Sequence, residues 1–200
     1  MKRIAITGGI GSGKTTFCTL LSEVGNAPIY DSDLRAKELM NSHPLIRQGI
    51  IELFGPEAYS SKGLNRAYIA QKAFGDSSQL GALNQIVHPV VVADFDRWAA
   101  EQESRYVILE SALLFSSPLR GHYDLSIVVD APLEVRIERA TRRDGASREQ
   151  IEARMRNQMS AEEMCRLADR VVIADNIESL RKQAIELHNL ILGNQTTTAQ

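Results

Sequence analysis

The sequence has few cysteines, little net charge and no long apolar run, and each scarcity narrows the class of protein. Cys18 and Cys165 are the two cysteines among 200 residues, and neither has a partner at the spacing of a metal site. We therefore expect two small buried thiols in a reducing cytoplasm rather than a disulfide. The formal net charge of −2 favours neither nucleic acid nor an acidic membrane as a partner.

We also expect no signal peptide and no transmembrane helix. Lys2 and Arg3 lead directly into a short apolar run, and no segment has the length of a signal peptide or a transmembrane helix. No internal repeat is present. A chain of 200 residues that is 44% apolar suits one α/β domain with an insertion. We expect a cytoplasmic monomer acting on a small molecule, and the sequence leaves an oligomer open.

The most informative stretch is 4–16, an apolar strand followed by a glycine-rich turn and a predicted helix. Gly8 and Gly13-Lys14-Thr15 match the phosphate-binding pattern G-x-x-x-x-G-K-[ST]. Glycines let backbone N–H groups converge on a phosphate, and the start of a helix adds its positive dipole end. Lys14 would place a charge on the β- and γ-phosphates, and the Thr15 hydroxyl would hold Mg²⁺. The predicted ATP-binding residues of this loop are Gly9, Gly11, Ser12, Gly13, Lys14, Thr15 and Thr16.

Two other interpretations of this turn are weaker. A dinucleotide-binding turn needs G-x-G-x-x-G, which the glycines at 8, 9, 11 and 13 do not form. A turn without a ligand leaves the coincidence of strand, helix and Lys-Thr pair unexplained. The chain is therefore predicted to bind a nucleoside triphosphate.

Five short apolar runs, continuous rather than alternating, predict the buried strands of a parallel sheet. They cover 3–7, 28–30, 106–110, 125–130 and 170–174. Predicted helices alternate with them, which favours an α/β fold of the P-loop NTPase and nucleoside-monophosphate-kinase type with a five-stranded parallel sheet. Ligands of such sheets bind beyond the carboxyl ends of the strands.

Between the second and third of these strands the pattern is helical, with no convincing strand. Helices are predicted over 34–40, 44–54, 65–74 and 79–101, the last one interrupted at His88-Pro89. Because this block is longer than a crossover needs, we interpret residues 35–103 as a helical substrate-binding insertion in a core of residues 1–34 and 104–192. Extra scaffolding without a ligand role is the alternative. Residues 193–200 are polar and lack periodicity, which predicts a disordered tail.

Residues 139–160 carry several arginines on two predicted helices, the second with Ser147 as N-cap and Gln150 at the capping-box position. One interpretation is a solvated helical hairpin with ion pairs between neighbouring turns. The other is a mobile lid within the core, whose arginines close over the triphosphate. Phosphoryl transfer spreads negative charge that arginine side chains can neutralise, and closure excludes water.

Carboxylates follow the second and third predicted strands. Asp31 and Asp33 would lie on one side of an extended segment, and a kinase acting on an alcohol needs one carboxylate to accept the hydroxyl proton. The alternative for Asp33 is to cap the next helix. Glu110 ends the third strand and could reach the Mg²⁺ region. His88 is either a hydrogen-bonded structural residue or a catalyst.

Together these features resemble the dephospho-coenzyme A kinase family along nearly the whole chain. The resemblance is carried by the glycine loop and by motifs that recur in the family's order and spacing: Asp31-Ser32-Asp33, Leu83-Asn84, Ile86-Val87-His88-Pro89, Leu113-Leu114-Phe115, Arg139 with Arg143-Asp144, and Arg154 with Gln158. The family's Asp-x-Pro-Leu-Leu-Phe-Glu is here Glu110-Ser111-Ala112-Leu113-Leu114-Phe115-Ser116. Asp175-Asn176-Ile177 stands where Asn-x-Gly is common.

The resemblance implies ATP and Mg²⁺, and transfer of the γ-phosphoryl group to the ribose 3′-hydroxyl of dephospho-CoA. It implies Asp33 as the base, Lys14 and Arg143 as further catalytic residues, and the helical insertion as the CoA-binding part. The further ATP contacts that it implies are Arg139, Arg143 and Asn176. The implied acceptor contacts are Asp33, Asn84, His88, Pro89, Glu110 and Arg154.

Two alternative functions remain open from the residues. One is a P-loop kinase of another small acceptor, such as a nucleoside monophosphate or a sugar acid. The other is a P-loop regulatory ATPase or switch that binds a protein partner. A GTPase switch should carry Asn-Lys-x-Asp for guanine, and this sequence has no such motif.

Overall fold

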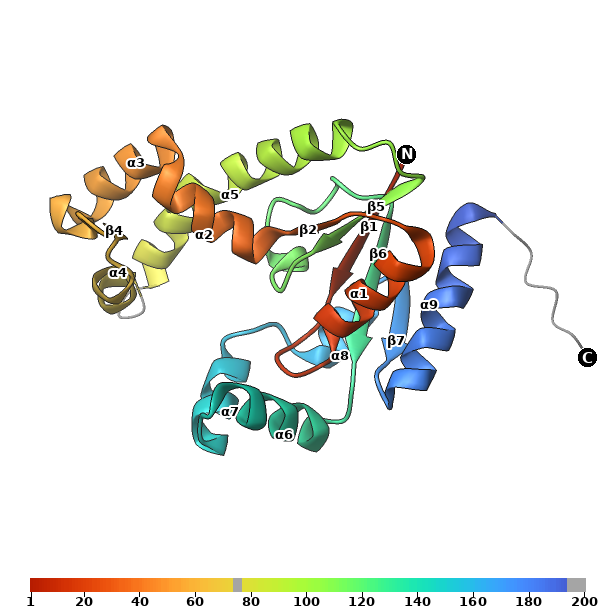
Figure 1. Cartoon of the computed structure of the whole chain (residues 1–200). Helices are drawn as coiled ribbons and strands as arrows, with labels where there is room; N and C mark the ends of the chain where they lie inside the picture. Colours follow the sequence, from red (N-terminus) through yellow and green to blue (C-terminus); the bar gives the residue numbers. More distant parts are fainter. Residues whose placement is uncertain (74–76, 194–200) are drawn as a thin grey trace, which may run out of the picture. The chain divides into compact units, whose positions relative to one another are not determined.

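The structure of the chain, a computed structural model, describes residues 1–73 and 77–193 (Figure 1). It divides into two units, Met1–Asp31 with Ala99–Gln200 and Ser32–Trp98. The insertion was predicted over 35–103, so the observed division lies a few residues earlier at both ends. Apart from Gly193, the predicted tail lies outside the described residues, as does position 74 of the helix predicted over 65–74.

A parallel sheet of five strands organises the first unit, in the order β2-β5-β1-β6-β7. The strands are β1 (Lys2–Thr7), β2 (Ile29–Asp31), β5 (Tyr106–Glu110), β6 (Leu125–Asp130) and β7 (Arg170–Ile173). The five predicted strands are confirmed, with each end within one residue of the predicted position. All of β5 is buried, because a strand inside a parallel sheet is covered on both faces.

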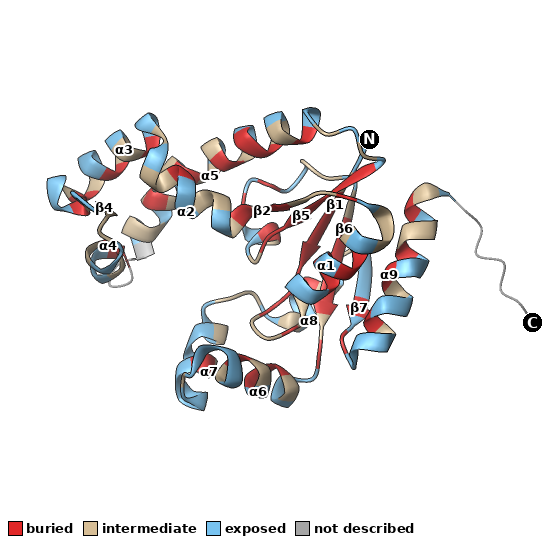
Figure 2. Ribbon diagram, viewed as in Figure 1, coloured by how far each residue is buried: buried red, intermediate tan, exposed pale blue. Residues whose placement is uncertain are grey.

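Helices α1 (Lys14–Gly25) and α9 (Ile177–Leu192) pack against each other, and their buried side chains join the core of the sheet. Ile4 and Ile6 of β1 meet Phe17 and Leu21 of α1 in this cluster. Figure 2 shows the buried residues concentrated on the strands and on the inner sides of these helices. The core therefore fixes the end of β1 and the start of α1, where the glycine loop lies.

A helical hairpin follows β6 in the first unit. It consists of α6 (Leu133–Asp144) and α7 (Arg148–Arg156), with α8 (Ala161–Leu167) after it. Ser147 accepts a hydrogen bond from Gln150 N–H and the Gln150 side chain accepts one from Ser147 N–H, so the predicted capping box is confirmed. Ile137 and Ile151 form a small core between the two helices.

The second unit is largely helical. Its helices are α2 (Ser32–Ser42), α3 (Pro44–Phe54), α4 (Arg66–Ala73) and α5 (Ser77–Ala100), the last shared with the first unit from Ala99 on. A 3-10 turn (Pro56–Ala58) leads to a hairpin of β3 (Tyr59–Ser60) and β4 (Gly63–Leu64). The expectation of no strand here was wrong. Two-residue strands leave no periodic pattern, and this pair depends on the distant Asn41 side chain, which accepts a hydrogen bond from Leu64 N–H.

The predicted break at His88-Pro89 was also wrong, because α5 continues through Pro89. Proline removes the hydrogen bond to the carbonyl four residues earlier, on Gln85. Pro89 and Gln85 are both exposed on one face of the helix, where water can satisfy that carbonyl.

Asp33 lies in the first turn of α2, which begins at Ser32 directly after β2. The prediction that Asp31 and Asp33 share one side of an extended segment was therefore wrong, because the helix starts earlier than expected. A carboxylate in the first turn also interacts favourably with the helix dipole.

Both cysteines are free thiols. Cys18 is fully buried, as predicted, and burial raises the pKa of its thiol well above the usual value. Cys165 is only half-buried, so the expectation of a buried side chain was wrong for this residue. Among the described residues, no helix is both long enough and apolar enough to span a membrane.

Candidate active site

The glycine loop joins the end of β1 at Thr7 to the start of α1 at Lys14. Gly11 (φ +75°) and Gly13 (φ +95°) adopt left-handed backbone conformations that other residues rarely take. Ser12 N–H donates to Gly9 O at 3.1 Å, which closes the turn. The first N–H groups of α1 have no partner within the helix and are available to an anion.

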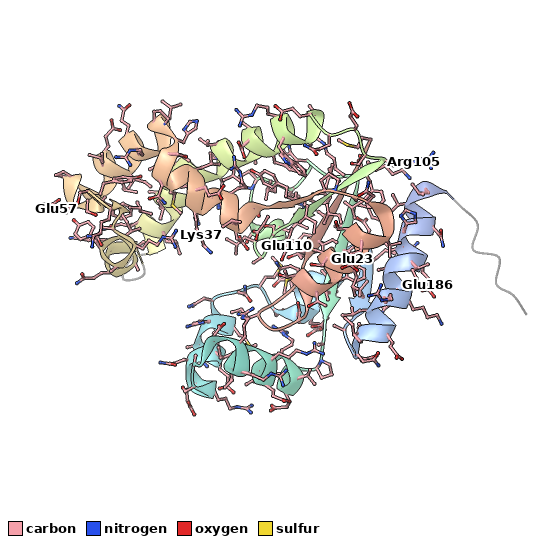
Figure 3. The ribbon with its side chains drawn as sticks, viewed as in Figure 1. Glu23, Lys37, Glu57, Arg105, Glu110 and Glu186 are labelled. Atoms are coloured by element: carbon pink, nitrogen blue, oxygen red, sulfur yellow. The ribbon has the colours of Figure 1, made fainter. Side chains whose placement is uncertain are left out.

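Lys14, Thr15 and Glu110 form a hydrogen-bonded cluster at the base of this loop. Lys14 Nζ and Thr15 Oγ1 both donate to Glu110 Oε1, at 2.5 and 2.6 Å. Glu110 ends β5 opposite Ile6 of β1 and is labelled in Figure 3. It is 4% exposed, so a buried carboxylate is neutralised by the lysine of the phosphate-binding motif.

The residues of this cluster fit a triphosphate and Mg²⁺. Thr15 and Glu110 supply the oxygen ligands that Mg²⁺ prefers, and Lys14 supplies a compact positive charge for phosphate. Ser12 Oγ is buried without a hydrogen-bond partner within the described part of the chain, which leaves a polar atom available in the loop. Glu110 was predicted to reach the Mg²⁺ region and to contact the acceptor, and in the structure its carboxylate accepts hydrogen bonds from the two phosphate-side residues.

Arg139 lies beside the end of the loop. Its Nη2 donates to Ala174 O at 2.9 Å and to Asp175 O at 3.3 Å, and a Cβ built on Gly13 would lie 3.7 Å from its Nη1. Asn176, predicted to contact ATP, caps α9, and its Oδ1 accepts from Ser179 N–H at 2.9 Å. The structure thus brings Arg139 to the loop and gives Asn176 a capping role.

Arg143 and Arg154 share one counter-ion on the hairpin. Arg143 Nε donates to Asp144 Oδ1 at 2.7 Å, and Arg154 Nη1 donates to Asp144 Oδ2 at 2.9 Å. The hydrogen bond from Arg143 is the main reason why the pKa of Asp144 is lowered. Arg148 pairs with Glu134 and Glu152 in the same hairpin. Of these contacts, only Arg148 with Glu152 is a pair between neighbouring turns, as the solvated-hairpin interpretation expects; the others join adjacent residues or the two helices.

The remaining predicted residues belong to the second unit. Asp33 is on α2, and Asn84, His88 and Pro89 are on α5. Asn84 and His88 are one helical turn apart and share a face. Burial lowers the pKa of His88, which favours the neutral imidazole. The predicted site residues are therefore divided between the two units, with the phosphate-side set in the first.

Two residues without a predicted role contact the glycine loop. Arg136 Nε donates to Ile10 O, and Gln158 Oε1 accepts from Ile10 N–H, both at 3.1 Å. Gln158 belongs to the motifs that carry the family resemblance, and this was the available signal. Arg136 had no signal, because an arginine on a predicted helix among other arginines indicates a solvated face.

The strand order, the glycine loop and the Lys14–Thr15–Glu110 cluster define a P-loop kinase fold with a phosphate-binding site at the start of α1. The sequence profile of the dephospho-CoA kinase family matches residues 2–180. The chain belongs to the dephospho-CoA kinase family. It is accordingly a kinase that uses ATP and acts on a small molecule.

Individual relatives agree with this assignment. The chain is 42% identical to a dephospho-CoA kinase of Bacteroides fragilis over 92% of its own length and 90% of the relative's. It is 40% identical to a dephospho-CoA kinase of Salinibacter ruber over 98% and 100% of the two chains.

Solved structures show the same fold. The protein TT1252 of Thermus thermophilus is 34% identical, with a TM-score of 0.83 over 98% of both chains. A dephospho-CoA kinase of Campylobacter jejuni, at 21% identity over 96% of this chain and 98% of the other, has a TM-score of 0.68. A shikimate kinase of Acinetobacter baumannii has a TM-score of 0.59 at 17% identity over 98% and 96%. The last two show the fold alone.

Proposed function

We propose that this protein transfers the γ-phosphoryl group of ATP to the ribose 3′-hydroxyl of dephospho-CoA, giving coenzyme A and ADP. The observation that carries the proposal is the hydrogen-bonded Lys14–Thr15–Glu110 cluster, with a buried Glu110 carboxylate, at the glycine loop of a chain that belongs to the dephospho-CoA kinase family. A phosphate-binding lysine next to oxygen ligands for Mg²⁺ suits phosphoryl transfer.

On the phosphate side, the N–H groups of the loop and of the first turn of α1 would bind the phosphate oxygens. Lys14 would leave Glu110 to contact the β- and γ-phosphates. Thr15 and Glu110 would hold Mg²⁺, which neutralises charge on the phosphoryl oxygens when bound. Glu110, the counter-ion of Lys14 in this structure, would then help to hold the metal, directly or through water. The other contacts proposed here are Gly9, Gly11, Ser12, Gly13, Thr16, Arg139 and Asn176.

On the acceptor side, Asp33 would accept the proton of the attacking 3′-hydroxyl, and the helical unit would bind the CoA moiety. Asp33 lies in the first turn of α2, a fixed position for a base. Asn84 and His88 would contact the acceptor from one face of α5, with Pro89 beside them. A neutral His88 can accept or donate a hydrogen bond without adding charge.

The α6–α7 hairpin would act as the lid, with Arg143 as the residue that neutralises the transferring group. Side chains of Arg143 and Arg154 are 65% and 55% exposed, and exposed ion pairs contribute little free energy. Exchange of Asp144 for a phosphate oxygen would therefore cost little. Arg154 would contribute a contact to the acceptor.

The experiment is to incubate the protein with ATP and Mg²⁺, with and without dephospho-CoA, and to measure ADP and the mass of the acceptor product. We expect ADP only with dephospho-CoA, and a product heavier by one phosphoryl group. Parallel reactions with a nucleoside monophosphate and a sugar acid test the other acceptor classes. Faster turnover on either of these, or hydrolysis indifferent to every acceptor, would contradict the proposal.

A further inference from the structure

Both backbone polar groups of Ile10, in the middle of the glycine loop, are bound by side chains from distant parts of the chain. Arg136 Nε donates to the carbonyl oxygen, and the N–H donates to Gln158 Oε1, each at 3.1 Å. These partners are 126 and 148 residues away in sequence. The conformation of the loop is therefore determined by tertiary contacts as well as by its glycines.

The side chain of Ile10 is held by the same part of the molecule. It packs against the small core of Ile137, Ala140 and Ile151 between α6 and α7. Arg136 is one residue before Ile137 on α6, and Gln158 follows α7. The α6–α7 hairpin and the residues just after it thus contact the Ile10 side chain through an apolar core and the Ile10 backbone through two hydrogen bonds.

Two glycines of the loop, Gly9 and Gly11, lie so close to Arg136 that a side chain would not fit at either position. A Cβ built on Gly9 would lie 2.1 Å from Arg136 Nη2, and one built on Gly11 would lie 2.1 Å from the Arg136 carbonyl oxygen. Neither distance is possible for real atoms, so each side chain would displace its neighbour. Gly9 leaves room for a guanidinium, and Gly11 leaves room for the backbone of α6.

Arg136 is itself fixed to the sheet. It is 7% exposed, and its Nη1 lies 3.7 Å from Asp130 Oδ1 at the carboxyl end of β6. A planar guanidinium offers donors in fixed directions, so one arginine can join the strand end and the loop. The buried charge is thereby compensated by Asp130 and by the Ile10 carbonyl.

We propose that Arg136 and Gln158 are positioning residues that hold Ile10, and with it the glycine loop, in the nucleotide-binding conformation before ATP arrives. Pre-organisation of this kind raises affinity because less conformational freedom is lost on binding. The proposal rests on the nucleotide-binding part of the proposed function. The tests therefore measure binding of ATP and Mg²⁺ by calorimetry without any acceptor.

The first test replaces Gln158 by methionine, which has similar length and no strong acceptor. We expect ATP to bind about 5- to 10-fold more weakly, from the loss of one hydrogen bond. Hydrogen exchange at the Ile10 amide should accelerate, and kcat at saturating ATP should stay within about threefold. Gln150→Met, in the capping box of the same hairpin, is the matched control and should leave both the Kd and the loop exchange unchanged.

The second test is a double-mutant cycle. Gly9→Ala should weaken ATP binding by about tenfold, because its methyl group displaces the guanidinium. In an Arg136→Ala background, where that space is free, Gly9→Ala should cost less than about twofold. Gly11→Ala should cost the same in both backgrounds, because it meets the backbone of residue 136 and has a φ of +75°.

Equal costs of Gly9→Ala in both backgrounds would overturn the proposal, because the methyl group would then block the phosphate itself. An unchanged Kd in Gln158→Met, or an equal loss in Gln150→Met, would also overturn it. Failure of phosphoryl transfer to dephospho-CoA, with these binding results intact, would contradict the proposed function alone.

Discussion

The cationic side chains that lie at the glycine loop and the exposed arginines of the α6–α7 hairpin are held in opposite ways. Lys14 of α1 and Arg136 of α6 have side chains that are only 13% and 9% exposed, and they are bound by groups from other elements, Glu110 of β5 and Asp130 of β6. Arg143, Arg148 and Arg154 are about half-exposed or more, and they pair with carboxylates of their own hairpin.

This difference in exposure indicates that the two sets of cations have different roles. Leaving one charge of a largely enclosed ion pair without a partner is costly, so Lys14 and Arg136 are held in place until a phosphate offers Lys14 another anion. Exposed pairs are close to neutral in free energy and can be exchanged for another anion. We infer that the loop supplies rigid phosphate binding and that the hairpin supplies arginines that are free to change partners.

Lys14→Ala should produce the largest loss among the cations compared here. It removes the charge on the transferring phosphates and leaves the buried Glu110 carboxylate without its lysine. We expect kcat/KM for ATP to fall by about 10²–10³-fold, the range for one charge-stabilising donor. Lys182→Ala, at an exposed position of α9, is the control, and steady-state kinetics measure both. A loss below about tenfold would mean that the loop does not depend on this charge.

Glu110→Gln separates the counter-ion role of Glu110 from its metal role. We expect kcat to fall by about 10–10²-fold and to require more Mg²⁺, because one oxygen ligand has lost its charge. ATP binding without Mg²⁺ should be unchanged or tighter, since Lys14 is no longer neutralised. Titration of activity with Mg²⁺ is the measurement, with the exposed Glu23→Gln as control. If Glu110→Gln needed no more Mg²⁺ than the unaltered protein, Glu110 would be a counter-ion of Lys14 and would have no metal role.

Arg143→Ala tests the hairpin side of the comparison. We expect kcat to fall by about tenfold and the Kd for ATP to change by less than about threefold, since this arginine would act mainly in the transition state. The melting temperature should hardly change, because the pair with Asp144 is exposed. Arg148→Ala removes another exposed ion pair of the same hairpin and should leave kcat unchanged. Equal losses in kcat and affinity would show that Arg143 merely binds ground-state phosphate.

His88 extends the comparison to a half-buried group of the second unit and should have the smallest effect. Burial lowers its folded-state pKa, so as the pH falls below about 6.5 the unfolded chain takes up the proton first. The free energy of unfolding therefore decreases as the pH falls from the unfolded-state pKa of His88 to its lower folded-state pKa. His88→Gln should flatten the fall in melting temperature below pH 6.5 by about 1–2 °C. Calorimetric melting at several pH values checks this, and an unchanged slope would contradict it.

The sheet and the loop could be predicted because their signals are local. A continuous apolar run and a glycine pattern before Lys14 are complete within a few residues, and the five strands lie where these runs lie. The same holds for the capping box at Ser147. The start of α2 was predicted two residues too late. This small error was enough to place Asp33 in an extended segment instead of in the first turn of the helix.

The contacts on Ile10 could not be predicted, for a physical reason. They join residues more than a hundred positions apart, and neither an arginine on a helix nor a glutamine just after a helix indicates which backbone group it will bind. The prediction of a break at Pro89 failed for a related reason, because the exposure of the freed carbonyl depends on the packing of the whole helix.

The most direct test concerns the carboxylate that is proposed to act on the acceptor. Asp33→Asn should leave the Kd for ATP unchanged, because the phosphate cradle is built in the other unit, and should lower kcat with dephospho-CoA by about 10²–10⁴-fold. A kcat within a few-fold of the unaltered protein, with ATP bound normally, would show that Asp33 is not the base and would contradict the account.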